Sequence, residues 1–161
     1  NRKISRPGKD ADAFEQALLS LAMDLAREIA RDGEGAEHLI TVRVGGARSE
    51  KAARRIAHTI ATSPLVKTAI AGRDANWGRI TAAAGRAGVP FRAEDVTLRF
   101  NDFLIFAKGR PVDFDEPALT QTLSNAEIDI DLTVGDGPGA ATVWTCDLTE
   151  SYIRINADYR T

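Results

Sequence analysis

Residues 127–134 read Glu-Ile-Asp-Ile-Asp-Leu-Thr-Val, a strict alternation of polar and apolar side chains. Successive side chains of a β-strand point to opposite faces of a sheet, so this period of two predicts a strand with one buried face. The face that carries the acidic residues must be in contact with water. The segment therefore favours a sheet that other elements cover on one side.

Strand signals recur on both sides of this segment. Short apolar or alternating runs predict further strands over residues 38–44, 65–71, 96–100, 103–107, 141–146 and 152–156. Asn101 and Asp102 separate two of these runs by two residues, which is the loop length of a tight β-hairpin. Gly72 follows another run and can adopt the positive φ that ends a strand.

A long helix is predicted near the start of the chain. Apolar residues recur there every three or four positions, at Phe14, Leu18, Leu21, Leu25 and Ile29. Asp12 and Glu15 have the spacing of a capping box, which marks the start of a helix, and Gly33 is expected to end it. One face of this helix is therefore apolar.

Three more helices are predicted, the first after Ser49, the second at 77–86 and the third after Asp115. Ser49 and Asp115 are typical N-cap residues, and Asn76 can accept hydrogen bonds from the free amides at the start of the second helix. Trp77 is expected to anchor the first turn of that helix. The core-facing positions are Ala53, Ile56, Ala57 and Ile60 in the first helix and Leu119 and Leu123 in the last.

The composition is that of an ordinary globular protein. The chain has 161 residues, 43% of them hydrophobic and 27% charged, and a net charge of -2. We expect a tail over residues 1–10 and a single domain over residues 11–161. No apolar run approaches the roughly 18 residues of a membrane span, and the basic residues are scattered. We therefore expect a soluble, cytoplasmic protein with neither nucleic acid nor membrane as a partner.

The expected element order, αβαβαββαβββ, indicates the α+β class. A mixed β-sheet with helices packed on one face fits this order better than a parallel nucleotide-binding sheet does. The glycine-rich run at 135–139 lacks the Gly-Lys-Ser or Gly-Lys-Thr ending of a phosphate-binding loop.

Residues near the two ends of the chain are candidates for ligand binding. Glu34 lies in an Asp-Gly-Glu-Gly corner just beyond the negative end of the first helix, where its carboxylate gains nothing locally and can serve a cationic partner. A solvated loop glutamate is the alternative. Asn156 and Thr161, with the terminal carboxylate, could hold the ammonium and carboxylate of an amino acid, although most chain ends are merely frayed.

The histidines and the cysteine are not predicted to be catalytic or metal-binding. His38, His58 and Cys146 have no neighbours in the sequence that would build a ligand set or activate a nucleophile. We expect the histidines to be surface or packing residues and Cys146 to be a small buried residue.

Several strings carry a resemblance to a known family. They are Asp-Gly-Glu-Gly at 32–35, Ser-Pro-Leu-Val-Lys-Thr-Ala at 63–69, Asp-Ala-Asn-Trp-Gly-Arg at 74–79, Cys-Asp-Leu-Thr at 146–149 and Asn-Ala-Asp-Tyr-Arg-Thr at 156–161. With these strings the chain resembles the C-terminal part of the ornithine acetyltransferase (glutamate N-acetyltransferase) family of arginine biosynthesis. The resemblance extends over nearly the whole chain from about Phe14 onward.

The resemblance implies a precursor that cuts itself and exposes a threonine as the first residue of its β-chain. That threonine takes the acetyl group of N-acetylornithine, forms an acyl-enzyme and passes the group to glutamate; its own amine can act as the base. Glu34, Asn156 and Thr161 match the positions of the family that contact the substrate. The chain begins with Asn1, so the nucleophile is expected upstream and the chain by itself is expected to be inactive.

The resemblance also implies partners, namely the upstream chain or chains of the same precursor in a hetero-oligomer of α- and β-chains. No cofactor is expected, and a second use of acetyl-coenzyme A as donor stays open. Two alternatives remain: a part of a self-cleaving aminopeptidase with an N-terminal nucleophile, and a non-catalytic amino-acid-binding domain. A co-purifying chain that begins with threonine would separate the enzymes from the binding domain.

Overall fold

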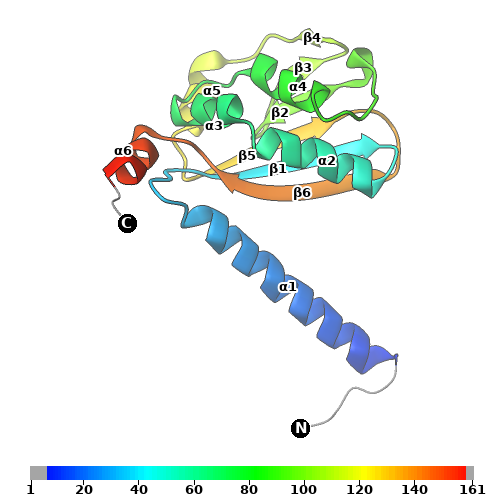
Figure 1. Cartoon of the computed structure of the whole chain (residues 1–161). Coiled ribbons are helices and arrows are strands. Elements are labelled where there is room, and N and C mark those ends of the chain that lie inside the picture. The colour runs from blue at the N-terminus through cyan, green and yellow to red at the C-terminus, as the bar shows by residue number, and fades with distance from the viewer. Residues whose placement is uncertain (1–6, 159–161) are drawn as a thin grey trace.

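A six-stranded sheet lies at the centre of the structure, a computed structural model that describes residues 7–158 (Figure 1). Its strands are β1 (Leu39–Ala47), β2 (Thr97–Phe100), β3 (Phe103–Ala107), β4 (Arg110–Pro111), β5 (Glu127–Thr133) and β6 (Gly139–Cys146). They lie in the order β4-β3-β2-β5-β1-β6. β1 runs parallel to β5, and the other neighbouring pairs are antiparallel. The mixed sheet predicted from the sequence is thus confirmed.

The helices lie mainly on one side of this sheet. Within residues 7–158 they are α1 (Lys9–Arg31), α2 (Glu50–Ala61), α3 (Pro64–Ala71), α4 (Trp77–Gly85), the short 3-10 helix η1 (Ala93–Asp95), α5 (Glu116–Thr122) and α6 (Glu150–Asp158). Figure 1 shows α2 to α5 on one side of the sheet, whereas α1 leaves the body on the other side. The predicted α+β class, a mixed β-sheet with helices packed on one face, is confirmed.

The face of the sheet beneath these helices is apolar because the strand residues alternate. Neighbouring residues of β5 and β1 pair in parallel register, as Ile128 with Ile40, Ile130 with Val42 and Leu132 with Val44. All six are at most 1% exposed. The helix α2 covers them with Ile56 and Ile60 and begins at its predicted cap, where the Ala52 amide donates to the Ser49 hydroxyl at 3.2 Å. Burial of each such side chain stabilises the fold by roughly 1.5–3 kcal/mol.

The opposite face of β5 is polar and open to water, as its aspartates predicted. Arg43 of β1 lies between Asp129 and Asp131, with guanidinium nitrogens 3.0 and 3.2 Å from their carboxylate oxygens. Partial burial opposes the charge of Arg43, but hydrogen bonds to both aspartates and their negative charges outweigh it and raise the pKa of Arg43. Because all three side chains remain well exposed, this cluster adds little to stability.

The strand predicted over residues 65–71 is wrong, because the segment is the helix α3. Pro64 occupies the first helical turn, where its missing N–H breaks no hydrogen bond, and Ser63 precedes it as the N-cap residue. The side chains that α3 buries are Val66, Ala69 and Ile70. Gly72 does not have the predicted positive φ, since its φ is -84° and the positive value of 55° belongs to Arg73.

The strand predicted over residues 152–156 is also wrong, because these residues lie within α6. Thr149 precedes this helix, and its hydroxyl accepts a hydrogen bond from the Tyr152 amide at 3.3 Å. Such a bond satisfies one of the amides that a helix start leaves free. The threonine cap therefore favours a helix over a strand in this segment.

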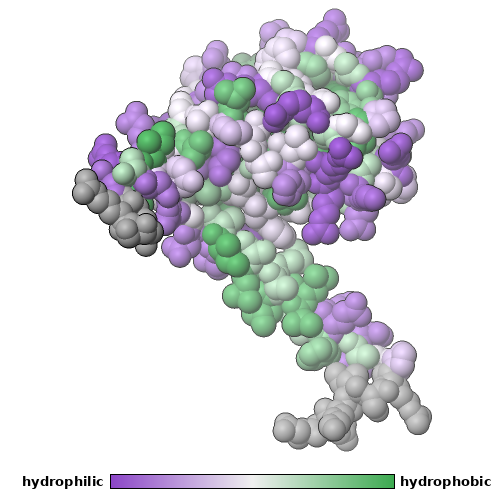
Figure 2. Space-filling model, in the orientation of Figure 1, coloured by the Kyte–Doolittle hydropathy of each residue, from purple (hydrophilic) through white to green (hydrophobic). Residues whose placement is uncertain are grey.

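The helix α1 differs from the prediction at its start and in its surroundings. It begins at Lys9 with Gly8 as its N-cap, so the capping box of Asp12 and Glu15 is wrong. No residue of α1 is buried. Its large exposed apolar side chains are Phe14, Leu18, Leu19, Leu21, Met23, Leu25 and Ile29. Figure 2 shows the resulting apolar surface, in green, along α1. Among the described residues, no helix combines the length and the apolarity that crossing a membrane requires.

Candidate functional site

Two of the three candidate binding residues meet beside the start of β1. Glu34 lies in the connection between α1 and β1, and Asn156 lies in α6. The Asn156 side chain donates a hydrogen bond of 3.0 Å from Nδ2 to Glu34 Oε2, although 122 positions separate the two residues. The same nitrogen donates to the Tyr152 carbonyl at 2.9 Å. Thr161 lies outside the described residues, so its place in this arrangement stays a prediction.

The corner at 32–35 reaches α6 because of its glycines. Gly35 has a φ of 66°, a conformation that other residues rarely adopt. A Cβ atom at this position would lie 2.6 Å from the Tyr152 nitrogen, which is too close for any side chain. Gly33 has a similar constraint, since a Cβ atom there would lie 2.7 Å from Cys146 Sγ. The two glycines therefore allow the backbone on either side of Glu34 to pack closely.

The charge of Glu34 is available to a ligand. Its side chain is exposed, and Asn156 is a neutral amide that leaves the negative charge of the carboxylate uncompensated. A carboxylate accepts charge-assisted hydrogen bonds from ammonium groups, and an asparagine side chain both donates and accepts. The pair can therefore bind a small molecule that carries an ammonium group and further polar atoms.

His38, His58 and Cys146 are placed much as the sequence predicted. His38 is 5% exposed, with Nδ1 2.7 Å from Asp147 Oδ2, and is a packing residue, whereas His58 lies on the surface. Cys146 is only partly buried, less than expected, and its Sγ lies 3.9 Å from Lys67 Nζ. Within residues 7–158, no group of three or more His, Cys, Asp or Glu side chains could hold a metal ion.

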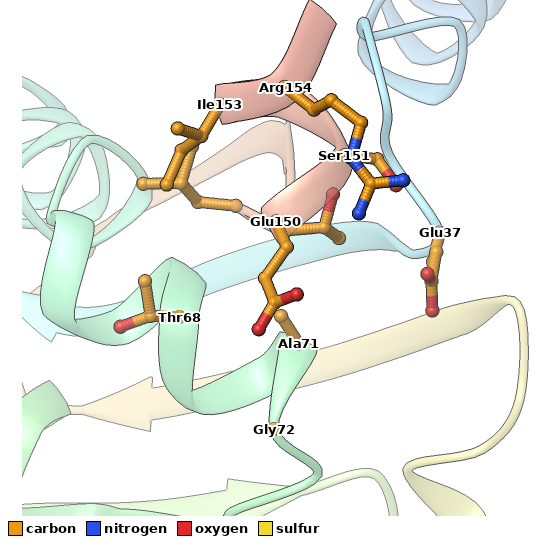
Figure 3. A pocket seen from close by; sticks show the side chains of 10 residues that line it. Glu37, Thr68, Ala71, Gly72, Glu150, Ser151, Ile153 and Arg154 are labelled. Atoms are coloured by element: carbon orange, nitrogen blue, oxygen red, sulfur yellow. The ribbon is translucent and has the colours of Figure 1, made fainter.

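A cavity of about 520 Å³ lies between α3 and α6 (Figure 3). Its polar lining includes Glu37, Thr68, Glu150, Ser151 and Arg154. Figure 3 shows the Arg154 side chain extending from α6 toward the loop that carries Glu37. Carboxylates and a guanidinium around one hollow can hold groups of either charge.

This cavity is distinct from the Glu34 and Asn156 pair. Arg154 and Asn156 are two positions apart on α6, which places them about 200° apart around the helix axis. Sequence reasoning missed the cavity because both of its walls, α3 and α6, were predicted to be strands. The proline after Ser63 was the signal that could have identified α3.

The string at 74–79 has the structural role that the sequence favoured. The Arg79 amide donates to Asn76 Oδ1 at 3.0 Å, so Asn76 caps α4 as predicted, and Asn76 Nδ2 donates to Asp74 at 3.0 Å. Trp77 stacks on Phe106 with ring centroids 5.1 Å apart. These contacts fix the junction between α3 and α4 and use most of the polar groups of the string.

Comparison with known proteins gives a consistent result. The model of the ArgJ family matches residues 1–161. The arginine biosynthesis bifunctional protein ArgJ of Zymomonas mobilis is 50% identical over 157 residues, which cover 97% of this chain and 38% of that protein. The protein of the same name from Parasynechococcus marenigrum is 51% identical over 92% of this chain and 36% of its own length. The chain thus spans less than two fifths of these relatives.

A solved structure has the same fold. The crystal structure of arginine biosynthesis bifunctional protein ArgJ from Bacillus halodurans aligns with a TM-score of 0.94 and 40% sequence identity. The alignment covers 99% of this chain and 75% of that chain.

Proposed function

This chain belongs to the ArgJ family, and from that membership we propose that it is part of an acetyltransferase of arginine biosynthesis. The proposed reaction moves an acetyl group from N-acetylornithine to glutamate through an acyl-threonine intermediate. The resemblance assigns the threonine nucleophile to polypeptide beyond these residues, and the relatives contain such polypeptide, since the match covers only 38% and 36% of the length of two of them. We place the reaction in the cytoplasm.

One observation carries the role of this chain in the reaction: the 3.0 Å hydrogen bond between Asn156 Nδ2 and Glu34 Oε2. The resemblance assigns both residues to the substrate pocket, and they lie in segments that are far apart in the sequence. A shared ligand requires both side chains in one place. Their contact supports a common pocket, to which Thr161 is proposed to contribute from the segment after α6.

The chemistry of the pair suits an amino-acid substrate. The Glu34 carboxylate would bind the substrate's ammonium group, and Asn156 would bind a neighbouring polar atom while it orients Glu34. The nucleophilic hydroxyl, with a terminal amine as its base and donors for the developing oxyanion, would come from the other part of the protein. This chain then binds and orients the substrate, and by itself it has no transferase activity.

The helix α1 supplies a surface for assembly with that other part. Seven large apolar side chains of α1 are exposed, and apolar surface of this extent is typical of a protein interface. The relatives are more than twice as long as the matched region, so they contain polypeptide that could cover it. We propose that α1 packs against the remaining chain of a hetero-oligomer of α- and β-chains.

The proposal is tested by Glu34→Gln in the full-length protein that contains this chain. The substitution keeps the shape of the side chain and removes its charge. We expect kcat/KM for acetyl transfer from N-acetylornithine to fall between about tenfold and a hundredfold, the effect of losing a charge-assisted hydrogen bond. Thermal stability should change little because Glu34 is exposed.

The matched control is Glu94→Gln. Glu94 is an exposed glutamate of η1 that forms an ion pair with Arg92 away from the proposed pocket. Removing the charge of Glu94 should leave acetyl transfer unchanged. Parental kinetics for Glu34→Gln would remove Glu34 from the pocket. Full-length protein that cleaves peptides but transfers no acetyl group would instead support the aminopeptidase alternative.

A further inference from the structure

The string Cys-Asp-Leu-Thr at 146–149 has no role in the proposed reaction, yet it contacts the corner that carries Glu34. The Asp147 side chain is completely buried. Its Oδ1 accepts hydrogen bonds from the Glu37 amide at 2.9 Å and from the His38 amide at 3.2 Å. Its Oδ2 lies 2.7 Å from His38 Nδ1. One carboxylate thus fixes both the backbone and a side chain where the corner enters β1.

Thr149 makes a second link, from the corner to α6. Its hydroxyl donates to the Gly35 carbonyl at 2.6 Å and accepts from the Tyr152 amide at 3.3 Å. Gly35 is the neighbour of Glu34, and the Tyr152 carbonyl is an acceptor for Asn156 Nδ2. The Thr149 hydroxyl therefore connects the segment that carries Glu34 with the turn of α6 that holds the Asn156 side chain.

Apolar packing does not fix the position of α6. The helix has no buried residue. The segment that leads into the helix is held instead by polar contacts, which include the Leu148 amide donating to the Lys67 carbonyl at 3.3 Å. With little packing to hold α6, the hydrogen bonds of Thr149 have a large share in setting its position relative to the corner.

We propose that Asp147 and Thr149 are positioning residues that hold Glu34 and Asn156 in the geometry that binds the amino-acid substrate. This inference rests on the proposed function, and it assigns the string at 146–149 a role in substrate binding. Neither residue touches the substrate. Each acts through the corner at 32–35 or through the first turn of α6.

The first test is Thr149→Val in the full-length protein, since valine has the shape of threonine without the hydroxyl. We expect kcat/KM for N-acetylornithine to fall about tenfold, mainly through KM. The reason is that the two hydrogen bonds of the Thr149 hydroxyl, which hold the segments of Glu34 and Asn156, are lost. Thr149→Ser keeps the hydroxyl and should restore kcat/KM to within about twofold of the parent. Thr59→Val is the matched control, because the Thr59 hydroxyl donates only to the Arg55 carbonyl in α2, and it should have parental kinetics.

The decisive readout is a double-mutant cycle with Glu34→Gln. If Thr149 acts through the pair of Glu34 and Asn156, Thr149→Val should lower kcat/KM clearly less in the Glu34→Gln background than in the parent, because half of the pair that it holds is already lost. A merely structural role would give the same tenfold loss in both backgrounds and would overturn this inference alone. Parental activity of Glu34→Gln would remove Glu34 from the substrate pocket, and this inference would fail with it. If Thr149→Val does not fold, Asp147→Asn, which keeps an oxygen for the two amides, replaces it in the same cycle.

Discussion

The helices α1 and α2 have the same kind of apolar periodicity and opposite surroundings. The 12-residue α2 buries Ala52, Ala53, Ile56, Ala57, Ile60 and Ala61, whereas the 23-residue α1 buries none of its residues. Most helices in proteins owe their stability to the packing of an apolar face. A sequence pattern thus identifies which face of a helix is apolar, but it does not identify what covers that face. The sheet covers α2, and the remainder of the protein is our proposed cover for α1.

The largest expected effect comes from equal truncations in the two helices. Ile56→Ala should lower the free energy of unfolding of the 161-residue chain by about 2–5 kcal/mol, because it leaves a cavity in the core. Leu18→Ala should change it by at most about 0.5 kcal/mol, because no core contact is lost. Urea denaturation followed by circular dichroism measures both. Equal losses for the two variants would mean that α1 packs on its own domain.

Acidic residues on the apolar face of α1 should weaken the assembly of the protein. Leu18→Asp combined with Leu25→Asp should weaken the association of this chain with the rest of its protein by at least about tenfold, because each buried leucine contributes roughly 1.5–3 kcal/mol. Gln16→Asp, on the opposite face of α1, is the control and should associate normally. Sedimentation of the separately purified parts measures the association. Normal assembly of the double variant would exclude α1 as the interface.

The smallest effects compare the two helix starts. Ser49→Ala should destabilise the chain by about 1 kcal/mol, because it removes the acceptor for the Ala52 amide. Asp12→Ala should lower the free energy of unfolding by only a few tenths of a kcal/mol. Asp12 lies within the first turn of α1, where its carboxylate interacts only with the helix dipole. Thermal denaturation resolves the difference. A larger loss for Asp12→Ala would restore the capping box.

The sequence predicted the elements whose signals are local and strong. The strand β5 alternates without exception, the β2–β3 hairpin has a two-residue turn, and α2 and α5 begin at Ser49 and Asp115. The helices α3 and α6 were missed because a short apolar run suits a strand and a helix equally. Only their caps separate the two, and Ser63 with Pro64, which directly follow the end of α2, form the start of α3.

The candidate site was predictable only in part. The resemblance selected Glu34 and Asn156, but nothing in the local sequence indicates that the two side chains touch. Their contact depends on Gly35, which allows the corner to approach α6. It depends also on the helical conformation of α6, a segment that was predicted to be a strand. The buried hydrogen bonds of Asp147 join residues about 110 positions apart, and a sequence pattern with a period of two or four cannot reveal them.

The central claim is that this chain binds the substrate while the reactive threonine lies in another part of the protein. The most direct test is to purify the chain and the remainder of its protein separately and to measure acetyl transfer from N-acetylornithine to glutamate by each part and by their mixture. We predict transfer by the mixture only, and its loss when the chain carries Glu34→Gln. Transfer by the 161-residue chain alone at the rate of the mixture would contradict the claim.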